Sequence, residues 1–151
     1  TVTQSGDDNR ATVDQTGDDD LDATITQSGD DNVASISQVY AGSRSDDRDA
    51  IVTQSGDDNR ATVYQTNGSN AAPIGTPNVV ADVLQSGDGN LADVFQDGIS
   101  LSADVNQRGD DNRSFVDQTG SLHTATVNQV SNDNVSTVAQ TGTNNTATHN
   151  Q

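Results

Sequence analysis

The sequence predicts an all-β solenoid in which strand–turn–strand rungs stack with parallel, in-register strands, as in cross-β, amyloid-like structures. Three observations support this fold class. Glutamine recurs along the 151 residues, most often every 11 residues. Small apolar residues alternate with polar ones before each glutamine, which is the period of a β-strand with one buried face. Gly-containing tetrapeptides recur after alternate glutamines. Internal repetition of this kind is typical of solenoids.

Composition alone would favour a disordered chain, since only 29% of residues are hydrophobic and the net charge is −17. All acidic residues are Asp and all basic residues are Arg, and Asp favours turns over helices, so helix is not expected. The acidity disfavours nucleic acid as a partner. No apolar run reaches membrane-spanning length, so membrane insertion is not expected either. There is no Cys and therefore no disulfide framework.

The glutamines define the repeat, because no Gln lies outside one series. Its spacing widens at three places, and the other repeat positions stay in phase through them. We expect these side chains to stack as amide ladders, together with an Asn that precedes every other Gln by six residues. The predicted ladder residues are Gln4, Gln15, Gln27, Gln38, Gln54, Gln65, Gln85, Gln96, Gln107, Gln118, Gln129, Gln140 and Gln151, with Asn9, Asn32, Asn59, Asn90, Asn112 and Asn134.

Two further positions are apolar in almost every repeat: Ala four residues before Gln, and Val or Ile two residues before it. They share one strand face with the amides, so we expect them to form a dry strip between two closely spaced sheets. The predicted core is Ala11, Val13, Ala23, Ile25, Ala34, Ile36, Ala50, Val52, Ala61, Val63, Ala81, Val83, Ala92, Val94, Ala103, Val105, Val116, Ala125, Val127 and Val138. The opposite face is irregular and mostly polar, as expected for solvent exposure.

The connections between strands alternate in length. One kind always has four residues before the next Asn, and Gly at its second place is expected to supply the positive φ of a tight turn, at Gly6, Gly29, Gly56, Gly87 and Gly109. The other kind carries the insertions, near 39–48 and 66–78. Residues 1–151 are therefore predicted to form one solenoid of about six two-stranded rungs, with insertions confined to one edge.

The end rungs are expected to template further chains, because the sequence shows no capping element and open strand edges pair readily. Addition of this kind does not close on itself and produces a filament. The predicted polymerisation residues are Val2, Gln4, Asn9, Val13, Val138, Gln140, Ala147 and Gln151. The chain's principal partner is thus expected to be itself, and the freshly diluted monomer is expected to be largely disordered.

Residues 4–15 read Q-S-G-D-D-N-R-A-T-V-D-Q and resemble the curlin repeat, Q-x-G-x-x-N-x-A-x-x-x-Q. Residues 27–38, 54–65 and 85–96 fit the same pattern, and 107–118 fits with Ser114 in place of Ala. The resemblance implies a secreted bacterial subunit of curli, the extracellular amyloid of biofilm matrix and surface adhesion. It also implies a nucleator, a secretion channel and chaperones as partners. Where the family usually has Ser, six residues before the second Gln, the chain has Leu21, Arg48, Val79, Leu101, His123 and Asn145.

Aspartates at the constant turns are expected to form a column in which like charges repel at close range. Calcium could bridge successive rungs there through Asp7, Asp8, Asp30, Asp31, Asp57, Asp58, Asp110 and Asp111, because it prefers oxygen ligands. A solvated edge screened by salt is the favoured interpretation, with no metal site and no cofactor. No catalytic constellation is present, so enzyme activity is not expected. Two alternatives to the fibre remain: a monomeric secreted β-solenoid adhesin, or a Ca²⁺-dependent binding module.

Overall fold

The computed structural model describes residues 1–17, 21–39, 47–66 and 79–151, which contain thirteen β-strands. The insertions predicted near 39–48 and 66–78 lie mostly outside the described residues. The strands are β1 (Val2–Ser5), β2 (Arg10–Thr16), β3 (Leu21–Ser28), β4 (Val33–Val39), β5 (Arg48–Ser55), β6 (Arg60–Thr66), β7 (Val79–Ser86), β8 (Leu91–Ile99), β9 (Ser102–Arg108), β10 (Arg113–Ser121), β11 (Thr124–Gln129), β12 (Val135–Thr143) and β13 (Thr146–Asn150).

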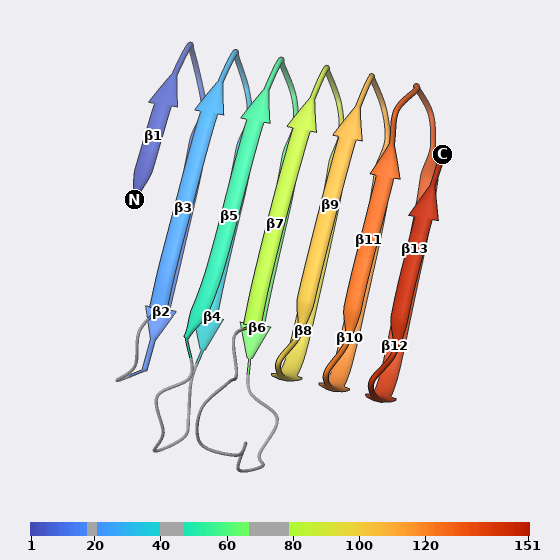
Figure 1. Cartoon of the computed structure of the whole chain (residues 1–151). Coiled ribbons are helices and arrows are strands. Elements are labelled where there is room, and N and C mark those ends of the chain that lie inside the picture. Colours follow the sequence, from blue (N-terminus) through green and yellow to red (C-terminus); the bar gives the residue numbers. More distant parts are fainter. Residues whose placement is uncertain (18–20, 40–46, 67–78) are drawn as a thin grey trace.

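Odd-numbered and even-numbered strands form separate sheets that lie face to face (Figure 1). The seven-stranded sheet runs β1-β3-β5-β7-β9-β11-β13 and the six-stranded sheet runs β12-β10-β8-β6-β4-β2. Every pairing is parallel, and equivalent residues face each other, as Gln27 faces Gln54 and Val63 faces Val94. The predicted fold class, an all-β solenoid with parallel in-register stacking, is confirmed. Within the described ranges, no helix is long and apolar enough to cross a membrane.

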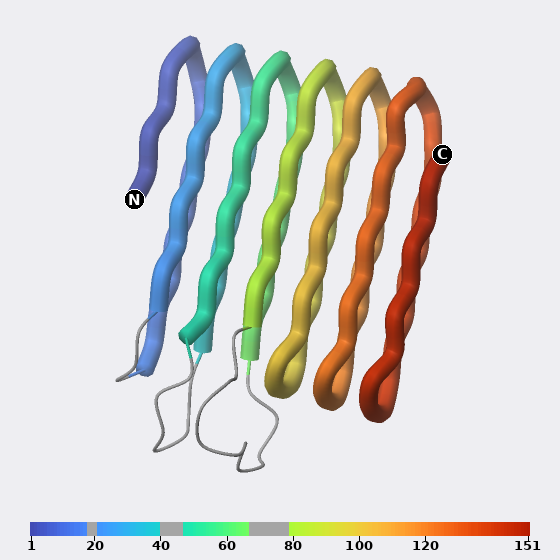
Figure 2. The backbone as a smooth tube through the Cα atoms, in the orientation of Figure 1, coloured from blue at the N-terminus to red at the C-terminus, as the bar shows by residue number. Residues whose placement is uncertain are grey.

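The constant turns lie along one edge of the stack, where the backbone bends in the same way in successive rungs (Figure 2). All five predicted turn glycines have positive φ, from 99° at Gly6 to 111° at Gly109. The residue at the fourth place of each turn is also left-handed, as at Asp8 (52°) and Asp133 (60°). Asp tolerates this region better than most residues, and Gly89 holds the same place in the fourth turn.

The sixth constant turn departs from the other five. Its second place is Ser131, and unlike the Gly of the other five turns this residue does not have a positive φ. In the first four turns the Asn side chain donates its Nδ2–H to the carbonyl of the next turn's Gly, as from Asn32 to Gly56 at 2.7 Å. Asn112 faces the sixth turn, and its buried Nδ2 has no hydrogen-bond partner among the described residues.

The core is the strip of Ala, Val and Ile side chains between the two sheets. The predicted core residues from Ala23 to Val138 are all buried and form one apolar cluster. Ala11 and Val13 of β2, and Ala147 of β13, are only partly buried, because these strands lie at the ends of the stack. Since the side chains are small, the sheets can approach closely, and the long Gln side chains close the strip on either side.

Candidate functional site: the amide ladders and the ends of the stack

Two continuous glutamine ladders run along the stack, one in each sheet. In the seven-stranded sheet every Gln donates from Nε2 to the Oε1 of the Gln in the next rung, at 2.7 to 3.1 Å from Gln4 through to Gln151. The six-stranded sheet repeats this from Gln15 to Gln140, at 2.7 to 3.0 Å. The structure thus places all thirteen predicted glutamines in ladders.

Each ladder also joins the two sheets. The second Nε2 hydrogen of Gln54 is donated to the Val33 carbonyl at 3.2 Å, and that of Gln107 to the Leu91 carbonyl at 2.9 Å. Gln65 donates to both the Asp49 and Val79 carbonyls, each at 3.1 Å. These amides are fully buried. Gln therefore satisfies backbone carbonyls at the corners of each rung that would otherwise lose water without gaining a partner.

The asparagine column is built differently from the amide-to-amide ladder that the sequence predicts. The Oδ1 atom of each Asn accepts the backbone N–H of the next Asn at 3.0 Å, as from Asn59 to Asn32 and from Asn112 to Asn90. Except at Asn112, the Nδ2 donates instead to a turn carbonyl. A direct amide-to-amide bond also joins Asn90 to Asn59, at 3.0 Å. The short Asn side chain lies beside its own turn, so backbone groups are its nearest partners.

The ladders have a direction, and this determines what an open end presents. In both Gln ladders the donor is the residue with the lower number and the acceptor is the residue with the higher number. A break between any two rungs therefore leaves free Gln Nε2 donors on one face and free Oε1 acceptors on the other. The two faces are complementary in hydrogen bonding, in strand polarity and in the order Asn–Ala–Val–Gln. One rung can accept another of the same kind with no change of side chains.

The predicted polymerisation residues lie on the terminal rungs. Val2, Gln4 and Val13 belong to β1 and β2 at one end, with Asn9 in the turn between them, and Val138, Gln140 and Ala147 belong to β12 and β13 at the other, with Gln151 just beyond. Val2 is 48% exposed, whereas its partner Ile25 in the next rung is fully buried. The described end strands therefore leave part of the apolar strip and one row of backbone hydrogen-bonding groups uncovered.

A further column of inward-facing side chains lies six residues before every second Gln. The sequence indicated it only as the position at which the chain lacks the family's usual Ser. Arg48, Val79, Leu101 and His123 are all buried there, at the edge opposite the constant turns. His123 accepts the Asn145 backbone N–H at Nδ1 (3.2 Å), and its Nε2 lies 3.2 Å from the Thr119 carbonyl. The signal was the position itself, because it lies two residues before the Ala column and so shares the inner face.

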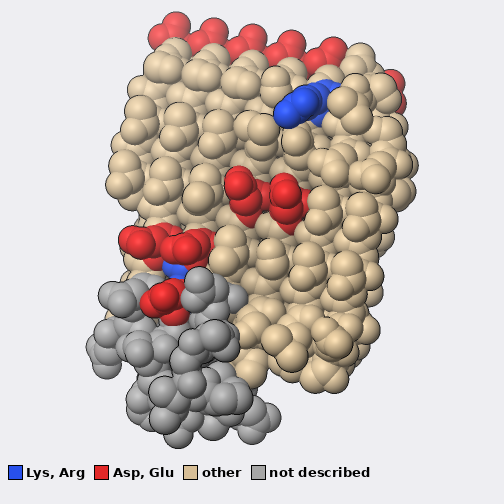
Figure 3. Space-filling view, viewed as in Figure 1, with Lys and Arg blue, Asp and Glu red and all other residues tan. Residues whose placement is uncertain are grey.

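Paired aspartates follow the constant-turn edge, which Figure 3 shows as a row of acidic side chains. Within the row, Asp30 and Asp57 accept the backbone N–H of the preceding turn's Asp at 2.8 and 2.9 Å. Loss of hydration, followed by repulsion from Asp58 and other neighbouring aspartates, raises the pKa of Asp31. Among the described residues, no group of three or more His, Cys, Asp or Glu side chains is placed to hold a metal ion. Calcium binding at the predicted positions stays an untested hypothesis for all eight residues: Asp7, Asp8, Asp30, Asp31, Asp57, Asp58, Asp110 and Asp111.

Comparison with known proteins identifies the repeat. The family model described as the curlin associated repeat matches residues 1–21, 19–46, 80–107 and 100–130, which together make up more than half of the chain. No curated protein and no solved structure matches.

Proposed function

The chain belongs to the curlin-repeat family, and we propose that it is a structural subunit that polymerises head to tail into an extracellular amyloid fibre. Curlin repeats on a β-solenoid are typical of a curli-like structural protein. The repetition of the same inner-face order in successive rungs, with Ala, Val and Gln stacked on their equivalents, carries the proposal. Because each Gln ladder presents donors on one face and acceptors on the other, the seven-stranded sheet can continue from one chain into the next through contacts of the kind that already join its rungs.

In the proposed junction, β1 of one chain pairs with β13 of another. Gln151 then donates to Gln4, as Gln129 donates to Gln151 within the chain at 3.1 Å. Val2 covers the partly open strip beside His149. These contacts of the seven-stranded sheet repeat ones already present between neighbouring rungs. Because the other sheet has only six strands, the same junction leaves one strand position open between β12 and the incoming β2.

The proposed setting is the cell surface, as part of a biofilm matrix that can also adhere. The principal partner is a second copy of the chain. By family, a nucleator, a secretion channel and chaperones would act before assembly. The charge of −17 suits a chain that stays dispersed until it meets a fibre end, because like-charged monomers repel one another.

Fibre diffraction tests the proposal directly. Protein incubated at high concentration in moderate salt should sediment and produce a reflection near 4.8 Å along the fibre, with a second near 10 Å or somewhat shorter across it. Protein that remains monomeric and produces no such reflection would contradict the fibre. It would favour the monomeric adhesin instead.

A matched pair of variants tests the docking geometry. Val13→Asp places a charge in the apolar strip of β2, and elongation of wild-type seeds should fall at least roughly tenfold, because an unpaired charge would be buried at the junction. Thr12→Asp adds the same charge to the exposed face of the same strand, in the column where Asp93 stands. It should elongate nearly as the wild type does. Equal elongation by both variants would exclude β2 from the junction.

A further inference from the structure

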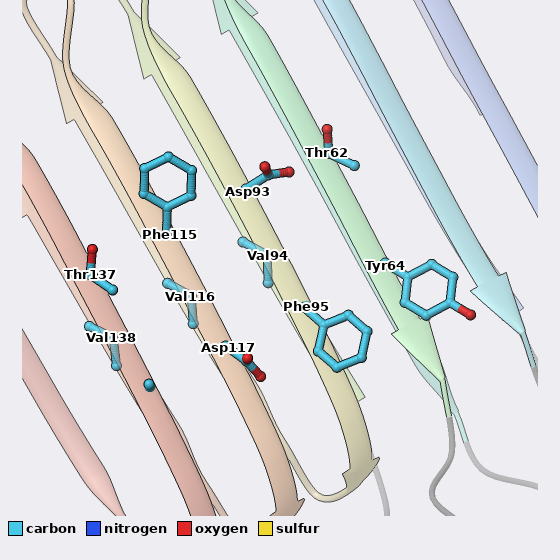
Figure 4. A pocket seen from close by; sticks show the side chains of 11 residues that line it. Thr62, Tyr64, Asp93, Val94, Phe95, Phe115, Val116, Asp117, Thr137 and Val138 are labelled. Carbon is cyan, nitrogen blue, oxygen red and sulfur yellow. The ribbon is translucent and has the colours of Figure 1, made fainter.

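The outer face of the six-stranded sheet carries a groove of about 480 Å³, which crosses β6, β8, β10 and β12 (Figure 4). Its floor is the strand surface itself, and its walls are side chains from two neighbouring columns. Small residues on β12, Thr137 and Ala139, leave the groove open on that side. A volume of this size matches sites that hold small organic molecules.

Three aromatic rings line the groove, in a chain that has few aromatic residues. Tyr64 and Phe95 stack with their centroids 5.4 Å apart and their planes 8° from parallel. Phe115 stands in the adjacent column on β10. Each of the three remains at least 36% exposed, although exposing an apolar ring to water costs free energy. Exposed apolar clusters of this kind are frequently binding surfaces.

Two carboxylates stand beside these rings in a reciprocal arrangement. Asp93 on β8 is the direct cross-strand partner of Phe115 on β10, and Asp117 on β10 is the partner of Phe95 on β8. Each column of the groove thus places a ring and a carboxylate side by side, in opposite order (Figure 4). A ring face attracts cations through its quadrupole, and an adjacent carboxylate strengthens that attraction.

The charged side chains around the groove indicate which class of ligand could bind there. Among the described residues, the lining contains two acids and no base. The arginines that begin β6 and β10, Arg60 and Arg113, share this face but do not line the groove. A second copy of the chain would bring another net charge of −17, and an anion would meet Asp93 and Asp117. A cation with an apolar or aromatic body complements both the rings and the carboxylates.

We infer that this groove is a binding site for organic ammonium cations that carry an aromatic group. The cationic nitrogen lies between Asp93 and Asp117, and the aromatic body packs against Phe95 and Phe115. The site is on a side of the stack rather than at its ends, so binding does not depend on polymerisation.

Equilibrium dialysis with benzyltrimethylammonium tests the inference, since it measures bound ligand whether the protein is monomeric or fibrous. Two variants alter the groove, Phe115→Thr and Asp117→Ala. Each introduces the residue that stands at the equivalent position of the next rung, Thr137 or Ala139, so the fold should be preserved. Each should weaken binding roughly tenfold. Asp104→Thr removes an acid from the opposite sheet, where Thr126 is its neighbour, and should leave binding unchanged.

A matched ligand separates charge from apolar contact. Neopentylbenzene has the shape of benzyltrimethylammonium without the charge, and it should bind at least roughly tenfold more weakly. Equal binding of the two compounds would overturn the inference, since the groove would then be only an apolar surface. Equal loss of binding in Asp104→Thr and Asp117→Ala would also overturn it, because net charge rather than the groove would then attract the cation.

Discussion

At the scale of single residues, the fold depends on side chains that satisfy backbone groups. Gln65 illustrates this: its amide contacts Gln96 and two backbone carbonyls, and it is fully buried. Asn has the same role at the constant turns. Asn112 is the exception, because Ser131 replaces the Gly whose carbonyl would accept from its Nδ2. An unpaired buried donor costs about 1–3 kcal/mol.

Ser131→Gly should therefore stabilise the stack. Glycine can adopt the positive φ of the other five turns and present its carbonyl to Asn112. We expect the free energy of unfolding to rise by on the order of 1 kcal/mol, after the entropic cost of Gly. The guanidinium midpoint of fully assembled protein measures the change.

The reciprocal variant Gly109→Ser is the control. Asn90 donates to the Gly109 carbonyl at 2.8 Å, so this change should lower the midpoint. A fall in both variants would show that Ser131 is not the cause of the unpaired Asn112.

At the scale of elements, the constant turns determine how strands follow one another. Successive turn glycines lie so close that a Cβ at Gly6, Gly29, Gly56 or Gly87 would collide with the carbonyl of the next. The turn column thus needs Gly for two independent reasons, positive φ and close approach. Gly142 at the opposite edge has only the first requirement, because nothing lies within 4 Å of the position that a Cβ would occupy there.

Gly56→Ala and Gly142→Ala separate these two effects, because their φ angles are nearly equal, at 100° and 102°. Gly142→Ala should cost about 1–2 kcal/mol from backbone strain alone. Gly56→Ala adds the collision with Gly87 and should cost at least about 3 kcal/mol in total. Guanidinium midpoints of the two assembled variants measure the difference, and equal midpoints would contradict the close approach.

At the scale of the whole molecule, in-register stacking concentrates charge, because an acid in one rung lies directly beside the equivalent residue of the next. Asp82 and Asp104 are such a pair on the outer face of the seven-stranded sheet. Loss of hydration, and then repulsion from Asp104, raises the pKa of Asp82. Burial, followed by repulsion from Asp22 and Asp47, does the same at Asp49.

Stability should consequently fall as pH rises from the ordinary Asp value, near 3.8, through these raised pKa values. The folded carboxyls hold their protons more tightly than the unfolded chain does, so mild acid favours the folded state. Asp82→Thr, which matches Thr126 in the same column, should reduce this dependence and raise the guanidinium midpoint near neutral pH. Midpoints from about pH 4 to pH 7 measure it, and an unchanged pH profile in Asp82→Thr would contradict the role of this pair.

The strands, their register and the core could be predicted from the amino-acid sequence, because these depend on short-range patterns. The alternation of Ala and Val before Gln assigns each side chain to a face, and the Gln series aligns the rungs even across insertions. Gly at the second turn place was equally readable, since few other residues adopt positive φ. The left-handed Asp at the fourth place was missed, although Gly89 was a signal for it.

The three-dimensional structure was needed to show how the Asn column bonds, what fills the column of Arg48 and His123, and which outer residues become neighbours. Phe115 and Asp93 are 22 residues apart in the sequence, yet they lie side by side because one full rung separates them. The outer positions do not repeat, so no local pattern indicates that three rings and two carboxylates converge. These side chains become neighbours because the number of residues in each rung determines which positions face each other on adjacent strands, where cross-strand pairs are in contact.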